Sequence, residues 1–418
     1  MTGSRVTLLL AGTLLCRWAA ASANEGAREL PERVTLEEAL KLLDERSPRT
    51  LAERATLDVV ASERLTASTY PNPLLSYGGL RLVSGANTGA VSQHQLVVEQ
   101  PLLLFGQRGQ RREVAELNVR SEAARIEAVM AEGRLEVRRA FAALLARQGA
   151  LGVLDESLAD LRRVESIVRE RATEGEQSLY DVLRIETEAQ SLDVEVMNAK
   201  ADLDDASGRL AALLGFPGWF PRAEGRLAPE GVPTDLGVLW ETAVRKRPAL
   251  AAIREQGAAA RGGLALARRE RWPVPALAAG PLLTRDEDGA SAFFGVSFPI
   301  PLFDRSQGAV VRASAAVRAE TLALDAEVAE ARAEIERART VLLQRSDALA
   351  TLESEVVERL PTLRRMAEDA YREGSGGILD LLDSFRTLTG IRLLHLRQLE
   401  NVKLAEAALV WAAGLDAP

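Results

Sequence analysis

An internal duplication limits what this chain of 418 residues can fold into. The same sequence features recur with a period of about 200 residues, which indicates a repeated structural unit. Each copy has an X-Pro step, then a segment with two prolines, and later a glycine followed by an aspartate at the same offset. These features are Ser47-Pro48, Tyr70-Pro71-Asn72-Pro73, Gly175 and Asp181 in the first copy, and Arg247-Pro248, Trp272-Pro273-Val274-Pro275, Gly374 and Asp380 in the second.

The two copies set the expected domain boundaries. The first repeat should cover residues 24–215 and the second residues 238–418, because the copies end alike at Gly215 and Gly414. Residues 216–237 between them carry several prolines and glycines, a composition that ends helices and predicts a linker.

Each repeat is expected to contain one helix, two strands and a long helical hairpin. The hairpins should cover residues 107–213 and 304–413. No proline interrupts residues 107–172, and roughly 65 helical residues at a rise of about 1.5 Å form a rod about 100 Å long. The returning helix of the first hairpin has apolar residues at alternating spacings of three and four, which predicts an antiparallel coiled coil. This heptad seam is Ala189, Leu192, Val196, Ala199, Leu203, Ala206, Leu210 and Leu213.

Four strands are expected, at about residues 74–83, 91–99, 276–283 and 290–298. The alternation is clearest in the last strand, where Ala292, Phe294, Val296 and Phe298 share one face. Strands of this length suit a membrane barrel, but a single-chain barrel needs at least about eight of them. Open strand edges do not occur in lipid, so protomers must share one barrel if these strands span a membrane. The predicted fold class is α+β, mostly α.

The N-terminus predicts export. Arg5 precedes an apolar run from Val6 to Cys16, and Ala21-Ser22-Ala23 forms a cleavage pattern, so residues 1–23 are expected to be a signal peptide. Cys16 is the single cysteine of the chain, and the mature protein would therefore have no disulfide and no thiolate ligand. Cleavage is favoured over lipidation of Cys16 because Leu15, rather than a small residue, precedes it.

Composition and motifs exclude several classes of function. The net charge of -8 opposes nucleic-acid binding, which calls for a basic face. No zincin, nucleophile-elbow, Walker A or dinucleotide-binding motif occurs, so we expect neither an enzyme nor a cofactor. The two histidines, His94 and His395, have no carboxylate or thiolate partner at ligand spacing, and we expect no metal site.

Two duplicated motifs carry a family resemblance. Pro101-Leu102-Leu103-Leu104-Phe105-Gly106 and Pro301-Leu302-Phe303-Asp304 lead from strand to helix in each copy, and a Gly-x5-Asp-x-Leu motif starts at Gly175 and Gly374. With both motifs doubled in the same order, the chain from Val34 to Leu415 resembles the TolC-like outer-membrane efflux protein family. The junctions look like those of its heavy-metal or cation efflux branch.

This resemblance implies a passive exit duct in the outer membrane. It implies a homotrimer whose four strands per chain form a 12-stranded barrel in outer-membrane lipid, continuous with a helical tunnel in the periplasm. It further implies two partners, a periplasmic adaptor and an inner-membrane transporter of the RND type. The substrates would be metal cations or small toxic compounds.

The hairpin turns are the expected functional site. Asp380 and Asp383 are three residues apart and share a helix face, so three copies would form two acidic rings at a constriction, as in cation-selective pores. Asp181 at the matching place and Tyr371 complete the expected gate. The alternative for Tyr371 is an aromatic side chain that only packs at the tip. The alternative is that Asp380, like Asp181, only interacts with the helix macrodipole as a first-turn acid. Gly175 and Gly374 should adopt positive φ in the turns, where an adaptor would dock.

Three other functions are open at this stage. A periplasmic adaptor also has a signal peptide and a coiled-coil hairpin, although usually one hairpin rather than two. A coiled-coil scaffold predicts no amphipathic strands, which Ala292, Phe294 and Val296 contradict. An outer-membrane duct of a type I secretion system would share the predicted fold.

Overall fold

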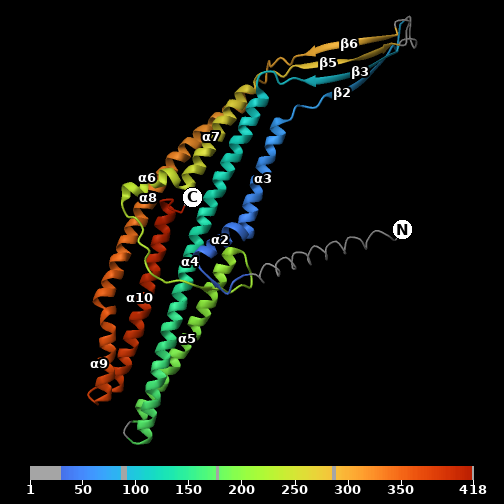
Figure 1. The fold of residues 1–418 in the computed structure, drawn as a ribbon. Helices are drawn as coiled ribbons and strands as arrows, with labels where there is room; N and C mark the ends of the chain where they lie inside the picture. The colour runs from blue at the N-terminus through green and yellow to red at the C-terminus, as the bar shows by residue number, and fades with distance from the viewer. Residues whose placement is uncertain (1–29, 86–91, 176–177, 285–288, 417–418) are drawn as a thin grey trace, which may run out of the picture. The chain divides into compact units, whose positions relative to one another are not determined.

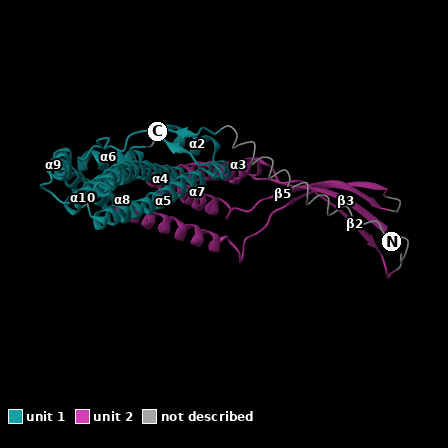
Figure 2. Cartoon of the chain, turned by 90° about the horizontal axis from the view of Figure 1, so that it is seen from below, with its two compact units in different colours: residues 1–53, 128–247, 330–418 teal, residues 54–127, 248–329 magenta. Residues whose placement is uncertain are grey.

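The structure is a computed structural model that describes residues 30–85, 92–175, 178–284 and 289–416. The expected signal peptide and Cys16 lie outside these ranges. The chain divides into two compact units. Unit 1 comprises Met1–Glu53, Ala128–Arg247 and Glu330–Pro418, and unit 2 comprises Arg54–Glu127 and Pro248–Ala329 (Figure 2).

Helices dominate both repeats (Figure 1). The helices are α2 (Leu36–Arg46), α3 (Pro48–Ser68), α4 (Gln107–Thr173), α5 (Leu179–Leu214), α6 (Leu236–Lys246), α7 (Pro248–Arg269), α8 (Gln307–Glu355), the 3-10 helix η1 (Val357–Arg359), α9 (Leu360–Arg372) and α10 (Ile378–Ala412). The strands are β1 (Arg33–Val34), β2 (Leu74–Arg81), β3 (Ser92–Pro101), β4 (Arg222–Ala223), β5 (Ala276–Thr284) and β6 (Ala290–Ser297). Within the described ranges, no helix combines the length and hydropathy needed to cross a membrane.

The opening helix of each repeat is split in two, whereas the sequence predicted one helix. The first splits at Ser47, with φ -62° and ψ 128°, and the second at Arg247, with φ -61° and ψ 117°. Both residues precede a proline, which disfavours the helical region for the residue before it. The missing proline N–H and the extended backbone therefore produce an elbow between α2 and α3 and another between α6 and α7.

A glycine at the end of each returning helix contacts these elbows in unit 1. A Cβ at Gly215 (φ 80°) would lie 2.6 Å from Cδ of Pro48. A Cβ at Gly414 (φ 64°) would lie 2.8 Å from the backbone N and Cα of Arg247. Both positions therefore require glycine for conformation and for space.

Arg247 anchors the second elbow. Its guanidinium donates to the Ala412 carbonyl at 3.0 Å and to Glu334 Oε2 at 2.8 Å. It also lies 5.0 Å from the ring centroid of Trp411. A buried arginine is tolerated because a carboxylate and a carbonyl partner compensate its lost hydration.

The linker predicted at residues 216–237 contains structure that the sequence analysis missed. β4 pairs in parallel with β1, with Arg33 opposite Arg222 and Val34 opposite Ala223. Helix α6 begins at Leu236, where Asp235 caps it by accepting from the Val238 N–H at 2.9 Å. The irregular stretch is therefore shorter than predicted.

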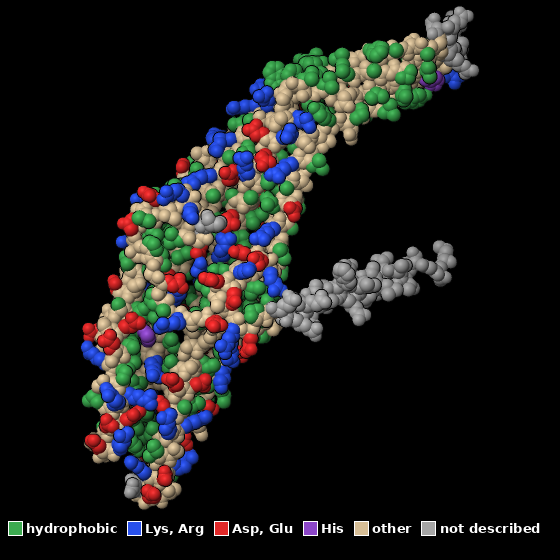
Figure 3. Space-filling view, in the orientation of Figure 1, with side chains coloured by type: hydrophobic (Ala, Val, Ile, Leu, Met, Phe, Trp, Pro, Cys, Tyr) green, Lys and Arg blue, Asp and Glu red, His purple; other side chains and the backbone are tan. Residues whose placement is uncertain are grey.

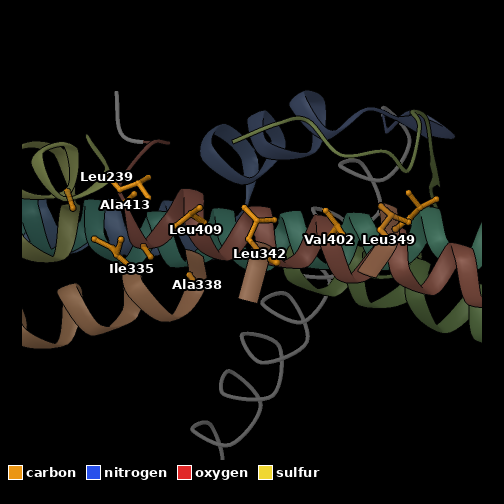
Figure 4. Close-up of a cluster of buried hydrophobic side chains, with 12 residues drawn as sticks. Leu239, Ile335, Ala338, Leu342, Leu349, Val402, Leu409 and Ala413 are labelled. Atoms are coloured by element: carbon orange, nitrogen blue, oxygen red, sulfur yellow. The ribbon is translucent and has the colours of Figure 1, made fainter. Parts of the chain in front are cut away.

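The coiled coils form the core of unit 1. In α5 the predicted seam is confirmed, since Ala189, Val196, Ala199, Ala206 and Leu210 are buried. A second buried cluster joins α6, the C-terminal part of α8, and α10 (Figure 4). Its large members are Leu239, Ile335, Leu342, Leu349, Leu399, Val402 and Leu409.

The outgoing helix of the second hairpin is interrupted, whereas the sequence predicted a continuous helix. The outgoing segment breaks after α8 at Val356, where φ is -123° and ψ is -57°, passes through η1, and resumes as α9. Pro361 stands in the first turn of α9, where its missing N–H removes no helical hydrogen bond. Helix α4, its counterpart in the first hairpin, contains no proline and is unbroken over its 67 residues.

Unit 2 contains a four-stranded antiparallel sheet in the order β2-β3-β5-β6. The predicted strands are confirmed with small shifts at their ends. The pairing register aligns the apolar positions of all four strands on one face, on which His94 and Gln100 of β3 are polar exceptions between the strand ends. Figure 3 shows hydrophobic side chains crowding this segment, with few charged ones. The apolar face consists of Leu75, Tyr77, His94, Leu96, Val98, Gln100, Leu277, Ala279, Pro281, Leu283, Ala292, Phe294 and Val296.

The opposite face of the sheet is mixed. It carries Gln93, Gln95 and Glu99 on β3 and Ser291 and Ser297 on β6, together with some apolar residues. The Ser297 hydroxyl donates to Glu99 Oε1 at 2.9 Å. The sheet therefore has one face suited to lipid and one suited to a partly polar interior.

We predict that Gly414→Ala destabilises the protein more than Gly218→Ala. Both glycines have positive φ, so both variants should lose about 1–2 kcal/mol for the left-handed backbone. Only Gly414 faces backbone atoms, since nothing lies within 4 Å of a Cβ at Gly218, and overpacking adds about 1–3 kcal/mol. Thermal unfolding followed by circular dichroism measures the difference, and equal losses would contradict the contact at the elbow.

Candidate functional site at the hairpin turns

The glycines of the two turns adopt the predicted conformation. Gly175 has φ 81° and Gly374 has φ 72°. Their N–H groups donate to the carbonyls of Ala172 and Tyr371, at 3.1 and 3.3 Å. No atom lies within 4 Å of a Cβ built on either glycine, so conformation rather than crowding requires glycine there.

The aspartates that follow the turns cap the returning helices. Asp181 forms a capping box with Ser178, whose hydroxyl donates to Asp181 Oδ2 at 2.8 Å. Asp380 occupies the same position in α10 and accepts from the Gly377 N–H at 3.0 Å. The equal spacing from turn glycine to aspartate in the two repeats thus has a structural cause, because both carboxylates accept from N–H groups that lack a helical partner.

Asp380 and Asp383 are both exposed in the first turns of α10. Asp383 interacts electrostatically with Arg386, and Glu188 of α5 binds the same guanidinium. These carboxylates raise the pKa of Arg386 above its ordinary value, Glu188 most strongly. Asp380 therefore has a capping role, while Asp383 carries its charge on the surface beside Arg386.

Tyr371 connects the two turns. Its ring packs beside a buried cluster that includes Val168, Ile185 and Leu381. Its hydroxyl is buried and has no hydrogen-bond partner among the described residues. Burial raises the pKa of the phenol; Arg171 opposes the shift and Asp181 adds to it. The structure therefore places Tyr371 within electrostatic range of both Arg171 and Asp181.

Arg171 is a member of this group that the sequence analysis missed. Its guanidinium lies 5.9 Å from the ring centroid of Tyr371. It is the basic residue in the last turn of α4, a place where positive charge stabilises a helix. A basic residue in the last turn of a predicted helix is a signal from which Arg171 could have been identified in the sequence.

Three arginines of the second hairpin pair with acids of the first, a pattern that no local sequence spacing indicates. Arg364 of α9 contacts Asp160 at 2.7 Å, and Arg392 of α10 contacts Glu156 at 2.8 Å. The third pair is Arg386 with Glu188. Exposed ion pairs contribute at most about 1 kcal/mol each, so these contacts orient the hairpins more than they stabilise them.

A groove runs between α4, α5 and α10 of unit 1. One cavity of about 330 Å³ is lined by Ser157, Glu188, Ser191, Glu195, Arg386 and Thr389. A second, of about 230 Å³, shares Glu195 and Leu393 with the first and continues to Asp202 and Glu400. Burial raises the pKa of Glu400, while Arg147 and Arg397 oppose the shift.

Both histidines have one polar partner. Tyr77 Oη lies 2.7 Å from His94 Nδ1, and the two rings stack. His395 Nε2 lies 2.8 Å from Glu353 Oε1, a carboxylate partner distant in sequence. In the described parts of the chain, no group of three or more His, Cys, Asp or Glu side chains is placed to hold a metal ion.

Comparison with known proteins indicates the family. The family described as Outer membrane efflux protein matches residues 44–216, most of the first repeat. The cobalt-zinc-cadmium resistance protein CzcC of Cupriavidus metallidurans is 25% identical over 373 residues, covering 88% of this chain and 87% of that protein. The chain is similar to the outer membrane efflux protein family. A nickel-cobalt-cadmium resistance protein, NccC of Alcaligenes xylosoxydans, is 25% identical and covers 73% of this chain and 70% of that protein.

Solved structures show that the likeness in fold extends over most of the chain. A crystal structure of CusC matches with a TM-score of 0.72 at 17% identity, over 91% of this chain and 92% of that one. A membrane protein from Pseudomonas aeruginosa matches with a TM-score of 0.75 at the same identity and coverage. The predicted family, mostly helical fold class and general function of an outer-membrane efflux channel are confirmed. The outer-membrane location with a periplasmic helical part is confirmed with them.

We predict that Tyr371→Phe folds at least as stably as the unmodified protein. The hydroxyl has no partner among the described residues, so its removal relieves a desolvation cost of about 1–3 kcal/mol rather than breaking a bond. Tyr371→Ala should be the less stable variant, because it removes the ring that packs beside the buried cluster. Thermal unfolding of both variants checks this, and a clear loss in the phenylalanine variant would show that the hydroxyl is bonded.

Proposed function

We propose that the protein is a homotrimeric exit duct of a tripartite efflux system that exports metal cations. The observation that carries this proposal is the two-faced sheet of unit 2. Its outer strands, β2 and β6, pair with no further strand within the described residues. Each unpaired backbone group costs several kcal/mol in lipid, so strands of other copies must cover these edges.

The trimer follows from strand count together with family resemblance. Four strands from each of three copies make a 12-stranded barrel, within the range known for closed outer-membrane barrels. The apolar face would contact lipid, and the face with Gln93, Gln95 and Glu99 would line the lumen.

The substrate class rests on the relatives. CzcC and NccC are named for resistance to cobalt, zinc, cadmium and nickel, and they cover most of this chain. We therefore propose metal cations as the cargo, with residues 1–23 as the signal peptide and residues 24–215 and 238–418 as the two repeats.

The hairpin turns would form the periplasmic gate. Asp380 and Asp383 would line the constriction as two acidic rings, and Tyr371, Asp181 and Arg171 would hold the two turns of one copy together. The turns at Gly175 and Gly374 would receive the periplasmic adaptor, which would link the duct to an inner-membrane transporter of the RND type. The transporter supplies the energy, and this protein supplies the path.

Membrane fractionation followed by mass determination of the detergent-purified protein tests the assembly. We expect an outer-membrane species at three times the mass of the mature subunit. A soluble periplasmic monomer would refute the shared barrel and favour an adaptor or scaffold.

Removing the acidic rings should reduce cation preference. We predict that Asp380→Gln with Asp383→Asn lowers the ratio of cation to anion permeability, because it removes two negative charges per copy from the constriction. Glutamine retains a side-chain acceptor for the Gly377 N–H, so α10 should still be capped. Single-channel recording in a salt gradient measures the ratio. Glu195→Gln with Asp204→Asn is the control with the same charge change on α5, and an unchanged ratio in the ring variant would refute the assignment.

A further inference from the structure

The two strand-to-helix junctions of unit 2 differ in burial. Between β3 and α4, Leu102, Leu103 and Phe105 are half-buried. Between β6 and α8, every residue from 298 to 305 is exposed. Phe303 is 91% exposed and Ile300 is 73% exposed. A run of uncovered apolar side chains of this size marks a contact surface.

The end of α7 and the segment after it cover the first junction. The ring of Phe105 stacks on Trp272, with ring centroids 5.4 Å apart. The Leu102 N–H donates to the Pro275 carbonyl at 2.7 Å. Arg269 Nη1 donates to the Phe105 carbonyl at 3.2 Å. The first repeat is thus covered by the second repeat of the same chain.

The two junctions have the same local build. Gly106 (φ 77°) and Ser306 (φ 56°) both precede their helix in the left-handed region. Gln107 accepts from the Phe105 N–H at 3.0 Å, and Gln307 accepts from the Arg305 N–H at 2.7 Å. The second junction is longer, because Phe303 lies four residues before Gln307 whereas Phe105 lies two residues before Gln107. Junctions of the same build are nevertheless expected to need equivalent neighbours.

The equivalent neighbour for the second junction is the end of α3. Tyr70-Pro71-Asn72-Pro73 matches Trp272-Pro273-Val274-Pro275 in sequence. Within the chain, however, this segment leads into β2, while Phe303 follows β6, and these strands are the opposite edges of the sheet. The chain's own Tyr70 contacts Arg108, whose guanidinium lies 4.3 Å from the ring centroid.

We propose that Phe303 of one copy packs on the Tyr70 segment of a second copy, repeating between copies the contact of Phe105 with Trp272. This inference rests on the shared barrel proposed above. Within the chain, the β3–β5 register places Pro101 opposite Ala276 and thereby brings Phe105 to Trp272. The same register between β6 and β2 of the next copy places Pro299 opposite Leu74 and brings Phe303 to Tyr70.

The side chains along the adjoining helices fit this pairing. Within the chain, Arg111 of α4 pairs with Glu270 at 3.0 Å. Val311 is the equivalent of Arg111, because each lies four residues after the first residue of its helix. Ser68 is the equivalent of Glu270, because each lies two residues before the aromatic residue of the two-proline segment. Val311 is 65% exposed, and Leu65, one turn before Ser68, is 74% exposed. Neither equivalent position carries a charge, and exposed apolar side chains lie at one of them and one turn from the other.

Two cross-linking pairs test the proposal in the full-length protein carrying Cys16→Ser, which removes the single native cysteine. Pro299→Cys with Leu74→Cys reports the strand pairing, since Cα atoms of opposed antiparallel residues lie about 4.5–5.5 Å apart and allow a disulfide. Phe303→Cys with Tyr70→Cys reports the junction with a short bismaleimide. Phe294→Cys with Tyr70→Cys is the control, because Phe294 lies within β6 on the apolar face.

We expect both test pairs to give dimers and trimers on a denaturing gel and the control pair to give monomers. A strand cross-link without a junction cross-link would overturn the proposed contact and leave the duct standing. If neither pair cross-links, the proposed β6–β2 register and the junction contact both fail, and the mass of the detergent-purified oligomer decides whether the shared barrel fails with them.

A variant without new cysteines gives a second measurement. We predict that Phe303→Ala speeds exchange of subunits between labelled and unlabelled oligomers in detergent by at least about tenfold, the effect of losing an aromatic anchor at an interface. Phe294→Ala, an equally large truncation at a position 79% exposed, should leave the exchange rate unchanged. Equal rates in the two variants would overturn the proposal.

Discussion

Backbone groups at the edges of the sheet are the constraint on which the rest of the structure depends. A four-stranded sheet has two outer strands whose N–H and C=O groups point away from any partner, and an apolar environment leaves such groups uncompensated. The face that includes Leu75, Leu96 and Phe294 favours such an environment. Closure with other copies resolves this conflict in the proposed trimer. It also fixes the order of the helices, because α3, α4, α7 and α8 are each joined to one strand of the sheet.

The duplication explains which features are shared and which diverge. Both repeats retain an elbow at an X-Pro step, with Gly215 and Gly414 providing space at the ends of the returning helices. The outgoing helices differ, since α4 is unbroken while Val356 and Pro361 interrupt its counterpart. A continuous coiled coil resists bending, whereas a break lacks the hydrogen bonds that would keep the helix straight. The second hairpin, which carries Asp380 and Asp383, therefore has an interruption that the first hairpin lacks.

Features set by local chemistry could be predicted from the sequence. The seam of α5 follows from the heptad spacing of Ala189, Val196 and Leu210, and the turn glycines follow from the need for positive φ. The strands were less clear individually, because Leu75 and Tyr77 on β2 form a convincing apolar face only beside β3 and β5. The elbow at Ser47 was missed although Pro48 signals it, because strong helical composition on both sides outweighed one residue.

Contacts between distant segments could not be predicted. Arg364 and Asp160, or Tyr371 and Arg171, come together only when the two hairpins pack, and no spacing along one helix encodes that register. The same holds for β1 and β4, whose two-residue strands are too short to give a periodic signal. Family resemblance indicated that the turns form the functional site, but it did not identify Arg171 or the three ion pairs.

Asp380 shows that a capping role and a pore role are compatible. The carboxylate accepts from the Gly377 N–H through Oδ2, at the positive end of the α10 macrodipole. The bond does not neutralise the side chain; it holds a full negative charge at a fixed place in the first helical turn. A selectivity ring needs that combination, because a charge on a freely rotating side chain would spread its field over a wider volume. The equivalent Asp181 is fixed in the same way beside Ser178, and its charge also acts on the phenol of Tyr371, so one capping position has two different surroundings in the two repeats.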